Sequence, residues 1–275
     1  MVRLIASDLD GTLLTTDKHL SEENASELNR AFHQGAVIVP ATGRILAGLP
    51  AFIKEAEWFR WCILSNGAQV YDTEEEKTIF RSEISPELSV RVLEFADKLP
   101  VLYDIYSEGR GFMSADMLNA FDDNIADRFY RELIHSLREP VDDLKAFILS
   151  RQDIGVQKIQ FYFRKEDLPL RSELFPVLAK EFPELLSTTS VPFNIEINHR
   201  DANKGTALEA LCSHLGIPLT DTLAFGDNAN DLPMLHRAGI GVCMLNGTDE
   251  AKAAADYITS DNDSHGVAAA IRKFM

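Results

Sequence analysis

The strongest constraint on the fold is a series of short apolar runs that alternate with segments of helical periodicity. A strand whose side chains are all apolar is buried on both faces, and such strands, each followed by a helix, form a parallel sheet covered on both sides. We therefore expect an α/β core with strands from these runs. They are Leu4–Ser7, Ala36–Pro40, Trp61–Ser65, Thr222–Phe225 and Ile240–Met244. The first helix is expected to begin after Ser21, a good N-cap, and to end at Gly35.

The pattern changes between residues 84 and 190. Lys158–Phe163 alternates polar and apolar side chains, and residues 101–107 and 110–114 resemble two strands joined by a turn that contains glycine. Alternation is typical of an antiparallel sheet with one face in water and helices on the other. We therefore predict an α+β domain at 84–190, inserted into a core formed by 1–83 and 191–275.

Composition restricts the possible partners. The 275-residue chain carries a formal net charge of -16, which argues against nucleic acid or an anionic membrane surface as a partner. An anionic substrate would need a local cation. Three cysteines, Cys62, Cys212 and Cys243, lie far apart in the chain and are expected to be reduced and mostly buried. Together with the lack of a long apolar run, they favour a cytoplasmic protein without a membrane span. A monomer or a small homo-oligomer is expected.

Polar residues follow several of the predicted strands or begin a helix next to them. They are Asp8 and Asp10, Thr42 and Gly43, Lys204, and the run Asp227 to Asp231. Taken singly, an Asp-Gly turn, a surface lysine or a polar loop needs no functional explanation. Because the carboxyl ends of parallel strands share one edge of a sheet, where ligands bind, their combination predicts a site.

The residue types at this edge suit a phosphate monoester. Carboxylate oxygens of Asp8 and Asp227, with the backbone carbonyl of Asp10, are the hard ligands that Mg²⁺ prefers. Lys204 would offset the repulsion between these carboxylates and an anionic substrate. Thr42 offers a hydroxyl, and Gly43 lets its N–H approach a phosphate oxygen.

The spacing of the first two aspartates suggests their chemistry. One carboxylate can attack phosphorus, and the other can protonate the leaving alkoxide and later accept a proton from water. The backbone N–H of Leu9 between them can face the phosphate while its side chain faces the core.

Four motifs carry a family resemblance. In order, "DLDGTLL", "ATGR", "NKGTAL" and "GDNANDLPML" resemble the motifs of the haloacid dehalogenase (HAD) superfamily. The insertion between the second and third motifs resembles the type IIB cap of the Cof-type sugar-phosphate phosphatases. The resemblance implies an α/β fold, with a HAD-like Rossmannoid parallel-sheet core and an inserted α+β cap.

The resemblance also implies roles for individual residues. Asp8 would be the nucleophile and Asp10 the general acid/base, with Mg²⁺ held by Asp8, the Asp10 carbonyl and Asp227. The expected phosphate ligands are Leu9 N–H, Thr42, Gly43, Lys204 and Asn230. Asp231 would orient Lys204 or a metal-bound water.

The implied activity is Mg²⁺-dependent hydrolysis of a small phosphorylated metabolite, such as a sugar phosphate. A phosphomutase on the same scaffold and a non-catalytic sensor of phosphoryl ligands are the alternatives. The insertion is expected to act as a mobile lid that selects the substrate. Candidate selecting residues are Tyr103, Tyr106, Arg110, Lys158 and Gln160, with Arg44 and Asn66 from the core.

Overall fold

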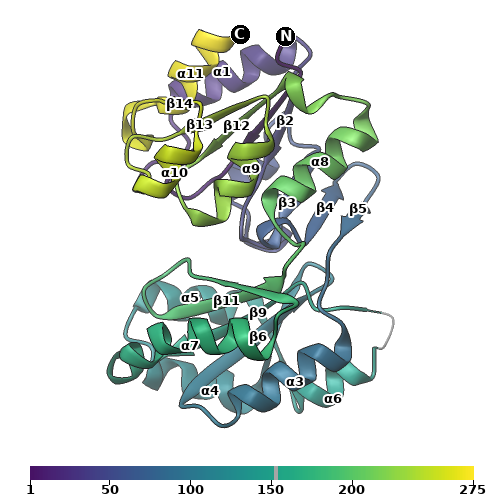
Figure 1. The fold of residues 1–275 in the computed structure, drawn as a ribbon, viewed down its shortest axis with the longest axis vertical. Coiled ribbons are helices and arrows are strands. Elements are labelled where there is room, and N and C mark those ends of the chain that lie inside the picture. Colours follow the sequence, from purple (N-terminus) through teal and green to yellow (C-terminus); the bar gives the residue numbers. More distant parts are fainter. Residues whose placement is uncertain (152–153) are drawn as a thin grey trace. The chain divides into compact units, whose positions relative to one another are not determined.

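A computed structural model describes residues 1–151 and 154–275 of the chain. By their internal contacts these residues divide into two compact units (Figure 1). The first unit comprises Met1–Arg44, Leu49–Arg81 and Asp201–Met275. The second comprises Ile45–Gly48 and Ser82–Arg200.

The main sheet of the first unit is parallel, as the apolar runs predict. Its strand order is β14-β13-β12-β1-β2, and every neighbouring pair is parallel. The strands are β1 (Leu4–Ser7), β2 (Val37–Pro40), β12 (Thr222–Gly226), β13 (Ile240–Cys243) and β14 (Tyr257–Ile258).

Helices cover this sheet. Ser21 caps α1 through its side chain, which accepts a hydrogen bond from Asn24 N–H, and Gly35 beyond the helix takes a positive φ of 92°. Leu208 and Leu211 of α8 belong to the same buried apolar cluster as Leu4 and Ala6 of β1. The α-helices of the unit are α1 (Glu22–His33), α2 (Ala51–Lys54), α8 (Lys204–Leu215), α9 (Leu232–Arg237), α10 (Asp249–Ala254) and α11 (Gly266–Phe274).

The strand register brings the polar motifs to one edge. Ser7 of β1 is paired with Pro40 of β2 on one side and Phe225 of β12 on the other. Since the three strands are parallel, the residues that follow them, beginning with Asp8, Ala41 and Asp227, leave the sheet at the same carboxyl edge.

The run Trp61–Leu64 forms β3, but its main partner is not a parallel strand. It pairs antiparallel with β4 (Gln69–Asp72), which pairs in turn with β5 (Lys77–Arg81). One parallel bridge, between Ala41 and Ile63, links it to the end of β2. This run was expected to be a strand of the parallel sheet, but among the described residues that single bridge is its only pairing with the sheet. The turn after the run folds the chain back, so β3 and β4 form a hairpin instead.

That turn also positions the start of α8. Gly67 has a φ of +99°, and a Cβ on it would lie 2.3 Å from the backbone carbonyl carbon of Asn203. Only glycine permits this close approach. The backbone immediately before Lys204 is thereby held against the turn that follows β3.

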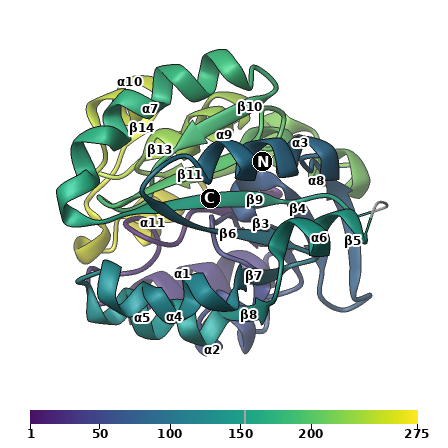
Figure 2. The same ribbon diagram turned by 90° about the horizontal axis from the view of Figure 1, so that it is seen from below.

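The second unit is built on a sheet with strand order β10-β11-β9-β6-β7-β8. Its pairs are antiparallel except for β7 and β8. Figure 2 shows β11, β9 and β6 side by side. The strands are β6 (Val101–Ser107), β7 (Arg110–Ser114), β8 (Arg138–Val141), β9 (Lys158–Phe163), β10 (Leu185–Thr188) and β11 (Asn194–His199).

The second unit extends past the boundary expected at residue 190. Strand β11 pairs with β9, so the unit runs to Arg200, and its other end lies at Ser82. Polar and apolar side chains alternate in β11 as they do in β9, because the two strands pair antiparallel in the same sheet. The division of the chain into a catalytic core and a substrate-selecting cap stays a prediction.

One face of this second sheet carries the apolar core, which includes Ile105, Ile159, Phe161 and Ile195. The helices of the unit are α3 (Pro86–Ala96), α4 (Ala115–Asn124), α5 (Arg128–Leu137), α6 (Leu144–Leu149) and α7 (Leu168–Glu181). Apolar side chains of α3, α6 and α7, among them Leu93, Ile148 and Leu174, belong to this core.

The opposite face of that sheet carries polar side chains, but these side chains are buried. The expectation that this face is exposed to solvent is therefore wrong. Lys158 is 1 % exposed and Gln160 4 % exposed. Both side chains form hydrogen bonds to polar partners, which makes their burial possible. Lys158 donates to Glu196 Oε1 at 2.9 Å, and Gln160 donates to Asp104 Oδ1 at 3.1 Å. Burial of such groups requires this pairing.

Two further expectations can be compared with the structure. Cys62, Cys212 and Cys243 are buried free thiols. Among the residues that the structure describes, no helix combines the length and the apolar character needed to cross a membrane.

Candidate active site

A fully buried lysine links two carboxylates at the carboxyl edge of the parallel sheet. Lys204 is the first residue of α8 and is 0 % exposed. Its Nζ donates to Asp8 Oδ1 and to Asp231 Oδ1, each at 2.6 Å. Short, charge-assisted hydrogen bonds of this kind hold three buried charges together.

The second oxygen of Asp231 fixes the loop after β12. Asp231 Oδ2 accepts hydrogen bonds from the backbone N–H groups of Asp227, at 2.9 Å, and Asn228, at 3.1 Å. A Cβ on Gly226 would lie 2.4 Å from Asp231 Cβ. Asp231 therefore orients both Lys204 and the segment that bears Asp227.

Asp227 is held by two residues that the motif reasoning did not single out. Thr12 Oγ1 donates to Asp227 Oδ1 at 2.7 Å. Gly11 has a φ of +91°, and a Cβ there would lie 2.7 Å from Asp227 Oδ2. The "DGT" segment of the first motif could have indicated these two contacts. Its glycine lets another carboxylate approach the backbone closely, and its threonine hydroxyl can donate to that carboxylate.

Three carboxylates are concentrated here. One oxygen each of Asp8, Asp227 and Asp231 lies within 4.8 Å of the other two. Oxygen donors of this type fit a hard divalent cation. Both oxygens of Asp231 already accept hydrogen bonds, so Asp8 and Asp227 are the better candidates for ligation.

Crowding changes the acidity of these groups. Burial, with the negative charges of Asp231 and Asp227, raises the pKa of Asp8 well above its usual range, although Lys204 opposes the shift. Burial and the charge of Asp231 raise the pKa of Asp227 to about 6, against the hydrogen bond from Thr12. Burial alone would lower the pKa of Lys204, but Asp231 and Asp8 outweigh burial and raise it. The cluster is thus short of positive charge.

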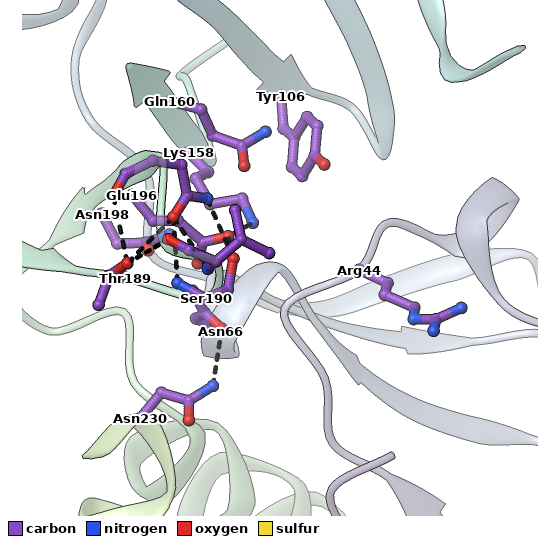
Figure 3. A network of polar contacts seen from close by, with 12 residues as sticks. Arg44, Asn66, Tyr106, Lys158, Gln160, Thr189, Ser190, Glu196, Asn198 and Asn230 are labelled. Carbon is purple, nitrogen blue, oxygen red and sulfur yellow. Dashed lines mark hydrogen bonds and ion pairs between the residues drawn. The ribbon is translucent and has the colours of Figure 1, made fainter. Parts of the chain in front are cut away.

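The predicted phosphate-binding side of the site is organised around Asn66. Its backbone N–H donates to the Thr42 carbonyl at 3.0 Å, and its Oδ1 accepts from Asn230 Nδ2 at 3.3 Å (Figure 3). A Cβ on Gly43 would lie 2.7 Å from the same Oδ1. Asn66 has a φ of 61°. Expected only as a possible substrate contact, this residue connects Thr42, Gly43 and Asn230.

Asp10 lies in a different electrostatic environment from Asp8. Arg44 donates to both its oxygens, at 2.8 and 2.7 Å, and Lys18 Nζ lies 2.9 Å from Oδ1. Burial alone would raise the pKa of Asp10, but the hydrogen bonds and charges of Arg44 and Lys18 lower it. Arg44 was expected to contact the leaving group, and no motif of the sequence pointed to Lys18. The Leu9 side chain between the aspartates is fully buried, as expected.

The candidate selecting residues of the second unit separate into groups. Tyr103 lies in the apolar core and donates its hydroxyl to Asp97 at 2.6 Å, on the face of the sheet opposite to Tyr106, Lys158 and Gln160. Arg110 forms an ion pair with the exposed Glu139. Lys158 Nζ lies 4.6 Å from the centre of the Tyr106 ring, and Figure 3 shows both near Gln160.

The fold and the site together define a class of protein, an α/β enzyme with clustered carboxylates and a buried lysine at the carboxyl edge of a parallel sheet. Residues 5–271 match the family model of the haloacid dehalogenase-like hydrolases, and the chain belongs to this family. The resemblance drawn from the four motifs is confirmed, and so are the fold class and the expectation of an enzyme.

Named relatives align along the whole chain. The 5-amino-6-(5-phospho-D-ribitylamino)uracil phosphatase YcsE of Bacillus subtilis is 30% identical over 279 residues, covering 100% of this chain and 96% of YcsE. The putative phosphatase YxeH of Bacillus subtilis is 32% identical over 287 residues, covering 100% and 99%. The solved structure of a haloacid dehalogenase-like hydrolase from B. subtilis superposes with a TM-score of 0.82 at 28% identity, covering 100% of both chains.

Removing the charge of Lys204 tests the electrostatics of the cluster. We predict that Lys204→Met lowers the free energy of unfolding by about 3–5 kcal/mol near pH 8, because a buried carboxylate pair loses its cation. In the folded variant the pKa of Asp8 would be higher than in the unfolded chain. At a pH above the usual aspartate range, the folded variant would therefore keep a proton on Asp8 that the unfolded chain has released. Its stability therefore falls as pH rises, and the deficit shrinks near pH 5.

Urea unfolding at both pH values measures this effect. Lys54→Met, at an exposed helical lysine, is the matched control and should change stability by less than about 0.5 kcal/mol at either pH. A deficit for Lys204→Met that is the same at both pH values would contradict the assignment of Lys204 as the counter-charge.

Proposed function

We propose that the chain is a Mg²⁺-dependent phosphatase of small phosphorylated metabolites in which Asp8 is the nucleophile. The observation that supports this most directly is the pair of 2.6 Å bonds from buried Lys204 to Asp8 and Asp231. In a chain of net charge -16, an anionic substrate needs a cation at the site, and Lys204 lies beside the proposed nucleophile.

The donor set fits Mg²⁺. Carboxylate oxygens of Asp8 and Asp227 and the backbone carbonyl of Asp10 would hold the ion, with Asp231 fixing the loop behind them. When bound, Mg²⁺ supplies positive charge that favours the ionised forms of Asp8 and Asp227 and neutralises charge on the phosphoryl group.

In the first step an Asp8 carboxylate oxygen forms a bond to phosphorus. The bond from phosphorus to the ester oxygen breaks, and its electron pair stays on that oxygen, which takes a proton from Asp10. Negative charge on the entering phosphate favours the protonated form of Asp10 against the effect of Arg44 and Lys18. Donors to the phosphoryl oxygens are proposed to be Leu9 N–H, Thr42, Gly43 N–H, Lys204 and Asn230.

In the second step Asp10, now a carboxylate, accepts a proton from water while the water oxygen bonds to phosphorus. The bond between phosphorus and Asp8 breaks, and its electron pair returns to the Asp8 carboxylate. Inorganic phosphate leaves, and Asp10 is protonated for the next turnover. A water molecule and a phosphate ester have become an alcohol and phosphate.

The proposed substrate class is a sugar or sugar-alcohol phosphate. The name of YcsE describes a substrate whose phosphate is on a ribityl chain, which is a polyol. We propose the second unit as a cap that selects the leaving group, with Tyr106, Lys158 and Gln160 as candidate contacts. Buried free thiols and the acidic composition fit a cytoplasmic protein that binds neither nucleic acid nor membranes.

Replacing the proposed nucleophile is the direct test of this assignment. We predict that Asp8→Asn abolishes phosphate release, because the amide is nearly isosteric but is a poor nucleophile. Circular dichroism should match that of the wild type. Asp17→Asn, at an exposed aspartate nearby in sequence, should keep full activity. If Asp8→Asn retained more than about one hundredth of wild-type activity, Asp8 would not be the nucleophile.

Metal dependence gives a second prediction. EDTA should stop phosphate release from a panel of sugar phosphates, and Mg²⁺ should restore it, whereas Ca²⁺ should restore little because it prefers longer bonds and more ligands. Asp227→Asn should raise the Mg²⁺ concentration needed for half-maximal activity. Full activity after exhaustive chelation would refute the metal site. A requirement for a bisphosphate with little free phosphate would instead indicate the phosphomutase.

A further inference from the structure

The Asp10 carboxylate has a third charged donor besides the two nitrogen atoms of Arg44. Lys18 Nζ lies 2.9 Å from Asp10 Oδ1, the oxygen to which Arg44 also donates at 2.7 Å. Arg44 Nε donates to the other oxygen at 2.8 Å. Arginine thus fixes the plane of the carboxylate, and lysine adds a further donor to one of its oxygens.

The backbone at Lys18 is in a conformation that lysine rarely adopts. Its φ is 64°, in the left-handed region where glycine and asparagine are favoured. It lies in a tight turn in which Lys18 N–H donates to the Thr15 carbonyl at 2.8 Å and Thr15 N–H donates to the His19 carbonyl at 2.9 Å. Backbone geometry alone would therefore favour glycine at this position.

Stability does not explain the lysine either. The Lys18 side chain is 51% exposed, and that of Asp10 is 37% exposed. Ion pairs with this exposure contribute little to folding, because water and salt screen them. A side chain that the turn disfavours and that folding does not require needs another explanation, and its contact with Asp10 supplies one.

We propose that Lys18 is a positioning residue that, together with Arg44, holds the Asp10 carboxylate where it can exchange a proton with the ester oxygen. This inference rests on the proposed function of Asp10 as the acid/base. A proton donor must lie within hydrogen-bond reach of the atom it protonates, and a small displacement slows the transfer strongly. With only Arg44 as a partner, the carboxylate has more freedom to move, and we expect this loss of position to outweigh the easier protonation that follows from removing the lysine charge.

The test replaces Lys18 with the residue that its backbone favours. Lys18→Gly should fold normally and keep or raise the melting temperature. Its kcat/KM for ribose 5-phosphate, whose alkoxide must be protonated, should fall about tenfold. The kcat/KM for 4-nitrophenyl phosphate, whose leaving group needs no proton, should fall by less than about threefold. Lys18→Arg, which keeps a cation, should restore most of the loss.

Glu76→Gly is the matched control. Glu76 also has a positive φ, of 49°, in a turn of the first unit, so the variant makes the same change of backbone freedom away from Asp10. It should leave both kcat/KM values unchanged. Equal losses of Lys18→Gly on the two esters, or wild-type values on both, would overturn the proposal.

A double-mutant cycle separates this proposal from the proposed function. In an Asp10→Asn background, Lys18→Gly should cause no further loss of kcat/KM, because the carboxylate is already gone. The same cycle in free energies of unfolding should be nearly additive, because the exposed ion pair contributes little to folding. Additivity of the losses in kcat/KM overturns the positioning role while Asp8→Asn remains inactive, whereas an active Asp8→Asn overturns the proposed function itself.

Discussion

The buried Lys204 between Asp8 and Asp231 is the interaction on which the candidate site depends. The carboxyl edge of the parallel sheet gathers three carboxylates in a chain that is already strongly acidic. Without a cation, the ionised forms of Asp8 and Asp227 would be costly, and their raised pKa values show this cost even with Lys204 present. Because positive charge is in short supply, the site is suited to a divalent cation. The charge of such a cation would in turn attract a phosphate ester.

The fold provides this arrangement through close backbone approaches as well as strand order. Parallel pairing of β1 with β2 and β12 places Asp8 and Asp227 at one edge. Gly67 holds the start of α8, and so Lys204, against the turn after β3, and Gly226 makes room for Asp231. Thr12 and Gly11 complete the contacts to Asp227. A larger residue at these glycines would move a charged group rather than only strain a loop.

The sequence predicted the parallel sheet and the joint position of Asp8, Lys204 and Asp227, because continuous apolar strands and polar strand ends are local patterns. It did not predict the contacts of Asp10 with Arg44 and Lys18, since each comes from a separate turn whose geometry is not periodic. The polar face of the second sheet was wrongly expected in water. Alternation in Lys158–Phe163 reveals two faces but not that Lys158 is buried and paired with Glu196. The end of that unit at Arg200 depended on the pairing of β11 with β9.

The central claim is that phosphate passes through a covalent bond to Asp8, and the stereochemistry at phosphorus tests it most directly. A substrate whose phosphoryl group is chiral through its oxygen isotopes and sulfur can be hydrolysed in isotopically labelled water, and the configuration of the product determined. Two successive in-line displacements, first by Asp8 and then by water, each invert phosphorus, so the account predicts net retention. Net inversion would show that water attacks the ester directly, and it would contradict the account.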